Sequence, residues 1–97
     1  MHRFEAELWL WEGDAAWHFV TLPEDISDAV EEQAGPRRGF GSVPVQVTIG
    51  SSTWTTSVFP DSKRGAYLLP VKKQIRTREG FGLGDRVLVE LVVREPG

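Results

Sequence analysis

The sequence predicts a small, mainly β protein that folds as an antiparallel barrel of about six strands with two short helices. Apolar residues alternate with polar ones at the two-residue period of a half-buried strand. Glycine and proline turns separate these stretches. The chain has 97 residues, 40% of them hydrophobic, which suffices for one core but not for two. We therefore expect a single β-barrel domain over residues 1–97.

The amino-terminal segment predicts a β-hairpin. Residues 3–11 alternate like a strand, a turn around residues 12–15 contains a Gly-Asp pair, and residues 16–22 form a second strand. Both faces of the first strand are apolar, because Trp9 and Trp11 lie opposite the other apolar side chains. The tryptophan face must then be covered by a helix, a partner subunit or a ligand.

A short acidic helix follows this hairpin. Pro23 suits the first helical position, and the acids after it meet the positive end of the helix dipole. Apolar residues repeat at helical spacing until the Gly-Pro pair at residues 35–36, namely Ile26, Ala29 and Val30. We expect this helix to cover the tryptophan face of the first strand.

The middle of the chain predicts a second hairpin. Residues 43–49 alternate regularly, a turn at residues 50–52 follows, and residues 53–59 are rich in β-branched and aromatic side chains. Pro44 suits an edge strand or an early strand position. An exposed turn then leads to a short strand at residues 66–69.

The carboxy-terminal third predicts a basic helix and a last strand. Pro70 opens the helix, Val71 and Ile75 share one face, and Gly80 ends it. A glycine-rich turn leads to the strand at residues 87–93. Closure of the strands into a barrel removes exposed sheet edges, and an open half-barrel that dimerises is the alternative.

Composition excludes several classes of protein. The chain contains no cysteine, which rules out disulfides, a thiolate nucleophile and cysteine-ligated metals, and which fits the reducing cytoplasm. The amino terminus has no apolar signal region. The longest uncharged apolar stretch, residues 8–11, is far shorter than the roughly 20 residues of a membrane span. We expect a soluble, cytoplasmic protein that does not insert into membranes.

Charge is distributed unevenly along the chain. The net charge of -3 disfavours general binding of nucleic acids or anionic membranes. Residues 1–34 carry nine acids and one base, whereas residues 35–97 carry ten bases and five acids. Either the acidic and basic elements pack together and neutralise one another, or the basic part faces a ligand.

Four stretches resemble the bacterial and archaeal family called domain of unknown function 1905, and together they span most of the chain. They are PVQVTIG (residues 44–50), TWTTSVFP (53–60), YLLPVKKQIR (67–76) and GDRVLVE (84–90). The resemblance implies a small double-split β-barrel. It implies no activity, because none is assigned to the family.

A shorter stretch, residues 68–87, resembles AbrB-type swapped-hairpin transcription regulators, which bind DNA as dimers. The shared pattern is a strand, a proline-led helical turn, a Gly-Asp pair and a strand. A purely structural origin explains this pattern, because the basic residues are not accompanied by an aromatic or base-reading pattern. We therefore do not expect nucleic acid as a partner.

The candidate ligand-binding residues are basic and aromatic. Six bases fall within residues 63–78, and helical spacing places Lys72 and Arg76 on one face. An arginine can hold a phosphate or carboxylate through two hydrogen bonds, with a lysine as a point charge. A solvated helix face is the alternative. The complete candidate site consists of Trp17, Arg38, Trp54, Lys72, Lys73 and Arg76.

The sequence holds no catalytic or metal-binding constellation. His18 lies within a strand and has no cysteine or spaced carboxylate as a partner. No His-x-x-x-His pair and no acidic loop with ligand spacing occurs. We therefore predict no catalytic residue, no metal and no cofactor.

These observations predict a non-catalytic binding domain for a small anionic ligand or a protein partner, either a monomer or a homodimer. Two alternatives remain open. The first is a DNA-binding regulator of the AbrB type. The second is a cofactor-free enzyme with a barrel pocket that uses His18 or a lysine of lowered pKa.

Overall fold

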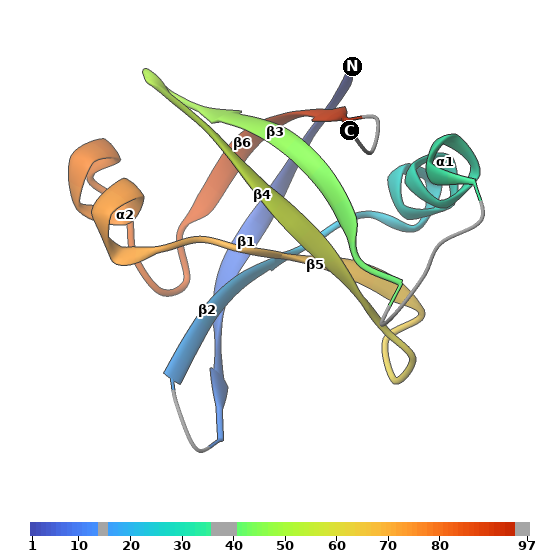
Figure 1. Cartoon of the computed structure of the whole chain (residues 1–97). Coiled ribbons are helices and arrows are strands. Elements are labelled where there is room, and N and C mark those ends of the chain that lie inside the picture. Colours follow the sequence, from blue (N-terminus) through green and yellow to red (C-terminus); the bar gives the residue numbers. More distant parts are fainter. Residues whose placement is uncertain (14–15, 36–40, 95–97) are drawn as a thin grey trace.

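The computed structural model describes residues 1–13, 16–35 and 41–94. These residues form six strands that close into an antiparallel barrel in the order β1-β2-β5-β4-β3-β6, and two helices (Figure 1). The predicted barrel is confirmed, and the open half-barrel is wrong. In chain order the elements are β1 (His2–Glu12), β2 (Ala16–Thr21), α1 (Glu24–Ala34), β3 (Val43–Ile49), β4 (Ser52–Asp61), β5 (Ala66–Pro70), α2 (Lys73–Glu79) and β6 (Arg86–Val93).

Two long strands close the barrel because each pairs with different neighbours along its length. In β1, residues 2–7 pair with β6 and residues 8–12 pair with β2. In β4, residues 52–58 pair with β3 and residues 59–61 pair with β5. Where β1 changes partner, the Leu8 N–H and carbonyl bond to the turn before β6 at 2.9 Å each. Both backbone groups of Leu8 therefore remain hydrogen-bonded where β1 changes its partner strand.

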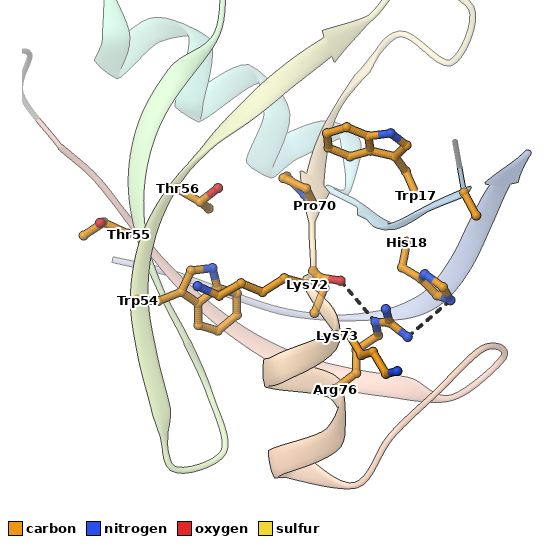
Figure 2. A pocket seen from close by; sticks show the side chains of 11 residues that line it. Trp17, His18, Trp54, Thr55, Thr56, Pro70, Lys72, Lys73 and Arg76 are labelled. Carbon is orange, nitrogen blue, oxygen red and sulfur yellow. Dashed lines mark hydrogen bonds between the residues drawn. The ribbon is translucent and has the colours of Figure 1, made fainter. Parts of the chain in front are cut away.

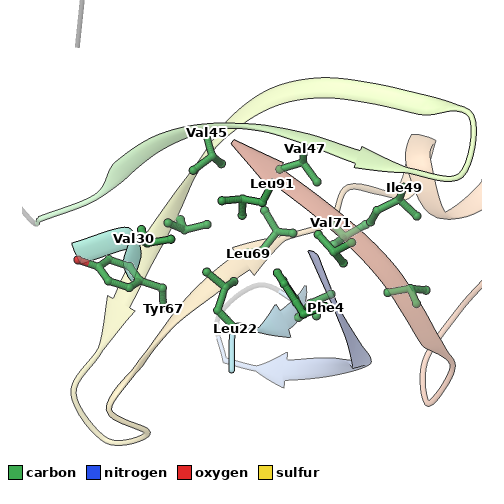
Figure 3. Packing of buried hydrophobic residues seen from close by; sticks show 14 of the residues in the cluster. Phe4, Leu22, Val30, Val45, Val47, Ile49, Tyr67, Leu69, Val71 and Leu91 are labelled. Carbon is green, nitrogen blue, oxygen red and sulfur yellow. The ribbon is translucent and has the colours of Figure 1, made fainter. Parts of the chain in front are cut away.

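The core fills the inside of the barrel (Figure 3). Alternate residues of β3 are buried while their neighbours are not, as a strand with one core face requires. Each helix adds an apolar side chain to this core, Val30 from α1 and Ile75 from α2. The helices lie on opposite sides of the barrel (Figure 1).

Helix α1 is attached to the sheet by a buried hydroxyl. The Ser27 side chain donates to the Leu22 carbonyl at 3.3 Å and accepts from the Tyr67 N–H at 3.1 Å. The Leu22 N–H also donates to the Tyr67 carbonyl at 2.9 Å. These bonds fix the start of the helix against β5, where Val30 enters the core.

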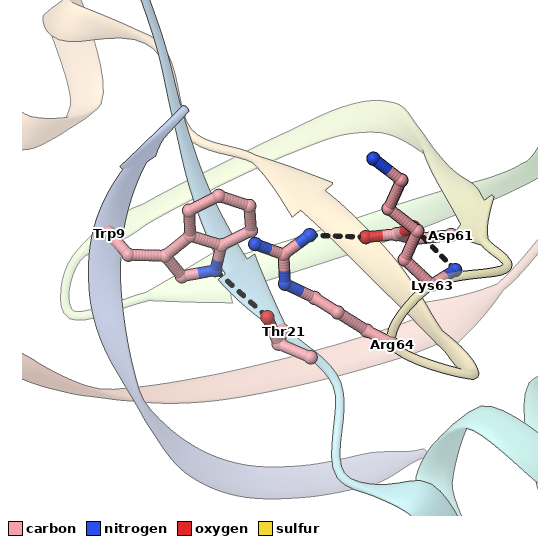
Figure 4. A network of polar contacts seen from close by, with 5 residues as sticks. All are labelled: Trp9, Thr21, Asp61, Lys63 and Arg64. Atoms are coloured by element: carbon pink, nitrogen blue, oxygen red, sulfur yellow. Dashed lines mark hydrogen bonds and ion pairs between the residues drawn. The ribbon is translucent and has the colours of Figure 1, made fainter. Parts of the chain in front are cut away.

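The expectation that α1 covers the tryptophan face of β1 is wrong. Trp9 is covered instead by the turn between β4 and β5, where the Arg64 guanidinium lies 4.2 Å from the centre of the indole (Figure 4). The Trp9 Nε1–H donates to the Thr21 hydroxyl at 2.8 Å, and the ring also contacts Phe19. A cation and a neighbouring ring thus take the place of the helix at Trp9, whereas Trp11, the other tryptophan of this face, stays 44% exposed.

The second helix begins at Lys73 and not at Pro70 as its sequence predicts. Pro70 remains in β5 and pairs with Phe19 of β2. The next residue, Val71, donates its N–H to the His18 carbonyl at 2.9 Å, so the chain stays extended through Lys72. Pairing with a neighbouring strand thus overrides the local preference of proline for a helix start.

The end of α2 is attached to the turn between β3 and β4 by a carboxylate. Glu79 accepts hydrogen bonds from the Ser52 hydroxyl at 2.5 Å, the Ser51 hydroxyl at 2.9 Å and the Ser51 N–H at 3.2 Å. These bonds, that of Ser52 first, hold the pKa of Glu79 below its ordinary value. Gly50 fits here because its φ is +59° and a Cβ would overlap the Glu79 carboxylate.

The core predicts a large contrast between two leucines of β6. Leu91 is fully buried, and its replacement by alanine should lower the free energy of unfolding by about 2–5 kcal/mol through lost contacts and a cavity. Leu88 is 42% exposed, so Leu88→Ala should change it by about 0.5 kcal/mol or less. Urea denaturation of both variants measures the contrast, and equal losses would contradict the assignment of β6 faces.

The Glu79 attachment predicts a pH-dependent contribution to stability. Because its pKa is lowered on folding, the carboxylate stabilises the fold above its unfolded pKa, and this is lost as pH falls through the folded value. Between about pH 6 and about pH 3, Glu79→Gln should therefore lose less stability than the wild type. Urea midpoints across this range provide the measurement. Glu12→Gln, at the exposed end of β1, is the matched control and should behave like the wild type.

Candidate functional site

A hollow of about 350 Å³, which we call the mouth pocket, opens between β2, β4 and the start of α2 (Figure 2). Its volume lies at the lower end of the range of about 300–1,000 Å³ that is typical of small-molecule sites. The lining residues are Ala16, Trp17 and His18 of β2, Trp54, Thr55 and Thr56 of β4, and Pro70, Val71, Lys72, Lys73 and Arg76.

Five of the six residues that the sequence nominates line this one pocket: Trp17, Trp54, Lys72, Lys73 and Arg76. The sixth, Arg38, lies outside the described residues. Sequence reasoning left out His18 as a ligand contact, together with both threonines of β4. Strand alternation alone places these side chains on faces but does not show which strands meet at the mouth.

Helix α2 presents its bases to the pocket because its apolar residue is used elsewhere. Ile75 is buried in the core, which turns Lys72, Lys73 and Arg76 toward the hollow. The Arg76 Nε–H donates to the Val71 carbonyl at 3.2 Å, within the same segment (Figure 2). The basic side chains thus come from five consecutive residues and converge on one cavity.

Trp54 forms the opposite wall. It pairs with Val47 of β3, whose side chain is fully buried, so the indole lies on the inner face of the barrel. The ring packs against the core yet stays partly exposed at the mouth. In the view of Figure 2, the Lys72 side chain extends across this indole. Part of the ring therefore belongs to the core, and part of it is available at the mouth.

His18 and Arg76 meet inside the pocket. Arg76 Nη1 lies 3.4 Å from His18 Nε2, so a neutral imidazole accepts there while the arginine donates. Burial, and then the charge of Arg76, lower the pKa of His18. The ring is therefore neutral at pH 7, and the pocket carries the charges of its two lysines and one arginine.

A second hollow, which we call the aromatic groove, lies on the outside of the barrel and measures about 720 Å³. Trp17 belongs to both hollows. Its ring stacks on Phe19 with 5.9 Å between centroids and 11° between planes. The remaining lining is Trp11, Phe59, Pro60, Asp61, Ser62, Lys63, Arg64 and Leu68.

The polar side of the aromatic groove is fixed by internal bonds (Figure 4). Asp61 forms an ion pair of 2.5 Å with Arg64 and accepts from the Lys63 N–H at 3.0 Å. The Arg64 bond is the main reason that the pKa of Asp61 is lowered. The guanidinium that lies against Trp9 is thus already paired with a carboxylate.

The part of the chain that the structure describes shows neither a cluster of metal ligands nor a membrane-spanning helix. Residues 1–13, 16–35 and 41–94 contain no group of three or more histidine, cysteine, aspartate or glutamate side chains placed to hold a metal ion. Within the same ranges no helix has the length and apolar character needed to cross a membrane.

Comparison with known protein families identifies the family of this chain. The family described as "Domain of unknown function (DUF1905)" matches residues 4–91, which is most of the chain. No curated protein matches it.

The contact between His18 and Arg76 predicts a measurable titration. The pKa of His18 should lie below its ordinary value of 6.5. In Arg76→Met it should rise only part of the way back to that value, because burial is the larger cause of the shift. NMR titration of the imidazole signals measures both values. Arg78→Met removes the same charge from an exposed position of α2 that does not line the pocket, and it should leave His18 unchanged. A wild-type pKa above 6.5 would contradict the contact.

Proposed function

The chain belongs to the DUF1905 family of small β-barrels, for which no function is known, and we propose from the pocket itself that it binds a small anionic ligand at the barrel mouth. The ligand carries a phosphate or carboxylate group. The proposed role is binding without catalysis.

One observation carries this proposal. Lys72, Lys73 and Arg76 converge on a concave site, and none of the described residues that line it is a carboxylate. A cleft lined by charge of one sign concentrates the electric field and raises the local concentration of counter-ions. Surface lysines normally spread into water, so their gathering around a hollow favours an anion there.

Arg76 is the anchor of the proposed site. Its Nε–H bonds to the Val71 carbonyl and one Nη1–H points to His18. The guanidinium has five N–H donors, so three remain for a ligand. Because two contacts already orient the side chain, little conformational entropy is lost when it binds an oxyanion. The two lysines act as point charges beside it.

The surroundings of His18 support binding over catalysis. A general base needs a proton to remove within hydrogen-bond reach and a partner that orients it. The Nε2 atom of His18 faces the Arg76 cation, which lowers its basicity, and the lining residues within the described part of the chain include no carboxylate to assist it. The imidazole acts as a positioning group for the arginine.

Titration with inorganic phosphate, followed by the backbone amide signals in NMR, tests the proposal. Phosphate should shift the signals of the mouth-pocket residues. Loss of a charge-assisted hydrogen bond of about 1.5–3 kcal/mol means that Arg76→Met should weaken binding about tenfold or more.

Arg78→Met is the matched control, since it removes one positive charge from the same helix at a position that does not line the pocket. Its phosphate affinity should stay within about twofold of the wild type, the small effect of a screened surface charge. Equal weakening by both variants would show nonspecific attraction to the basic helix and would refute the proposed site.

A further inference from the structure

We infer that the anion bound at the mouth pocket carries a flat ring, and that the ligand class is a free nucleotide. This inference rests on the proposed function and adds to it the part of the ligand that the bases do not contact. The geometry behind it is that cationic side chains and the indole of Trp54 line the same pocket (Figure 2).

The three basic side chains alone do not account for the size and lining of the pocket. Lys72, Lys73 and Arg76 suffice to hold a phosphate, yet the hollow extends to Trp54 and measures about 350 Å³. An inorganic anion at the bases would leave the exposed indole face in water. A nucleoside monophosphate can contact both the bases and the indole, because its ring system is joined to its phosphate through a short sugar.

Trp54 has the properties of a stacking surface. Its ring packs against the core on one side, and its strand pairs with β3, so its position is fixed. Among the described residues, Trp9 and Trp17 each contact Phe19, Trp9 at a tilt of 40° and Trp17 stacked, and no ring contact involves Trp54. Stacking on a preorganised indole is sequence-tolerant, because every nucleobase has an aromatic face.

Hydroxyl groups lie beside this ring. Thr56 is two residues after Trp54, so it shares the inner face of β4, and it also lines the pocket. A threonine hydroxyl donates one hydrogen bond and accepts others, which suits a ribose hydroxyl. The pocket thus offers cations, a hydroxyl and a ring, the groups that a phosphate, a sugar and a base require.

The test compares three compounds on the unmodified protein by isothermal titration calorimetry: inorganic phosphate, ribose 5-phosphate and adenosine 5′-monophosphate. Stacking should make the nucleotide bind about tenfold or more tightly than ribose 5-phosphate. Equal affinity of these two would overturn the inference while the proposed anion site stands. If phosphate fails to perturb the pocket at all, the proposed function fails as well.

Variants assign the gain to one ring. Trp54→Leu should remove the advantage of the nucleotide over ribose 5-phosphate and keep the affinity for ribose 5-phosphate within about twofold. Because Trp54 packs on the core, Trp54→Phe serves as a folded alternative that retains a smaller ring and part of the advantage. Trp11→Leu, in the aromatic groove, should keep the full advantage. A full advantage in Trp54→Leu would refute the stacking surface.

A nucleotide can also come from the end of a nucleic acid, so a 5′-phosphorylated oligonucleotide forms the last arm. Binding similar to that of the mononucleotide supports a free nucleotide as ligand. Binding more than about tenfold tighter would overturn that assignment and indicate a single strand, because further bases and phosphates would then contribute.

Discussion

The structure depends on two strands that each serve two sheets. Because β1 pairs first with β6 and then with β2, and β4 pairs first with β3 and then with β5, the barrel closes without a free edge. The same arrangement brings β2 and β4 to one mouth, although 35 residues separate His18 from Trp54 in the numbering. The pocket is a consequence of closure and needs no dedicated loop.

Small polar contacts then set the positions of the helices on this barrel. Ser27 connects α1 to β5, and Glu79 connects the end of α2 to the turn between β3 and β4. With Ile75 in the core at its middle, α2 is held at two points. The bases at the start of α2 therefore face the mouth pocket from a helix whose position is fixed. Side chains on such a rigid element are positioned more precisely than side chains on a flexible loop.

Much of this could be predicted from the sequence because strand alternation is a local signal. Strand alternation predicts the strands and their closure into a barrel. Together with charge and aromatic content it also nominates six residues, of which five line one pocket. What failed was non-local. Pairing of Pro70 with Phe19 delays the second helix, and Arg64 covers Trp9 from 55 residues away. The contact of Arg76 with His18 joins residues 58 apart, and no local pattern encodes it.

The placement of the two helices gives the molecule an electric dipole. The acids of α1 and the bases of α2 lie on opposite sides of the barrel (Figure 1). At physiological salt, charge is screened over about 8 Å, so the acidic side does not cancel the field at the mouth pocket. An anion that reaches the barrel mouth by diffusion therefore meets mainly the positive field of the bases there. The net charge of -3 therefore describes how the molecule migrates in a distant field, and not what a solute meets at the barrel mouth.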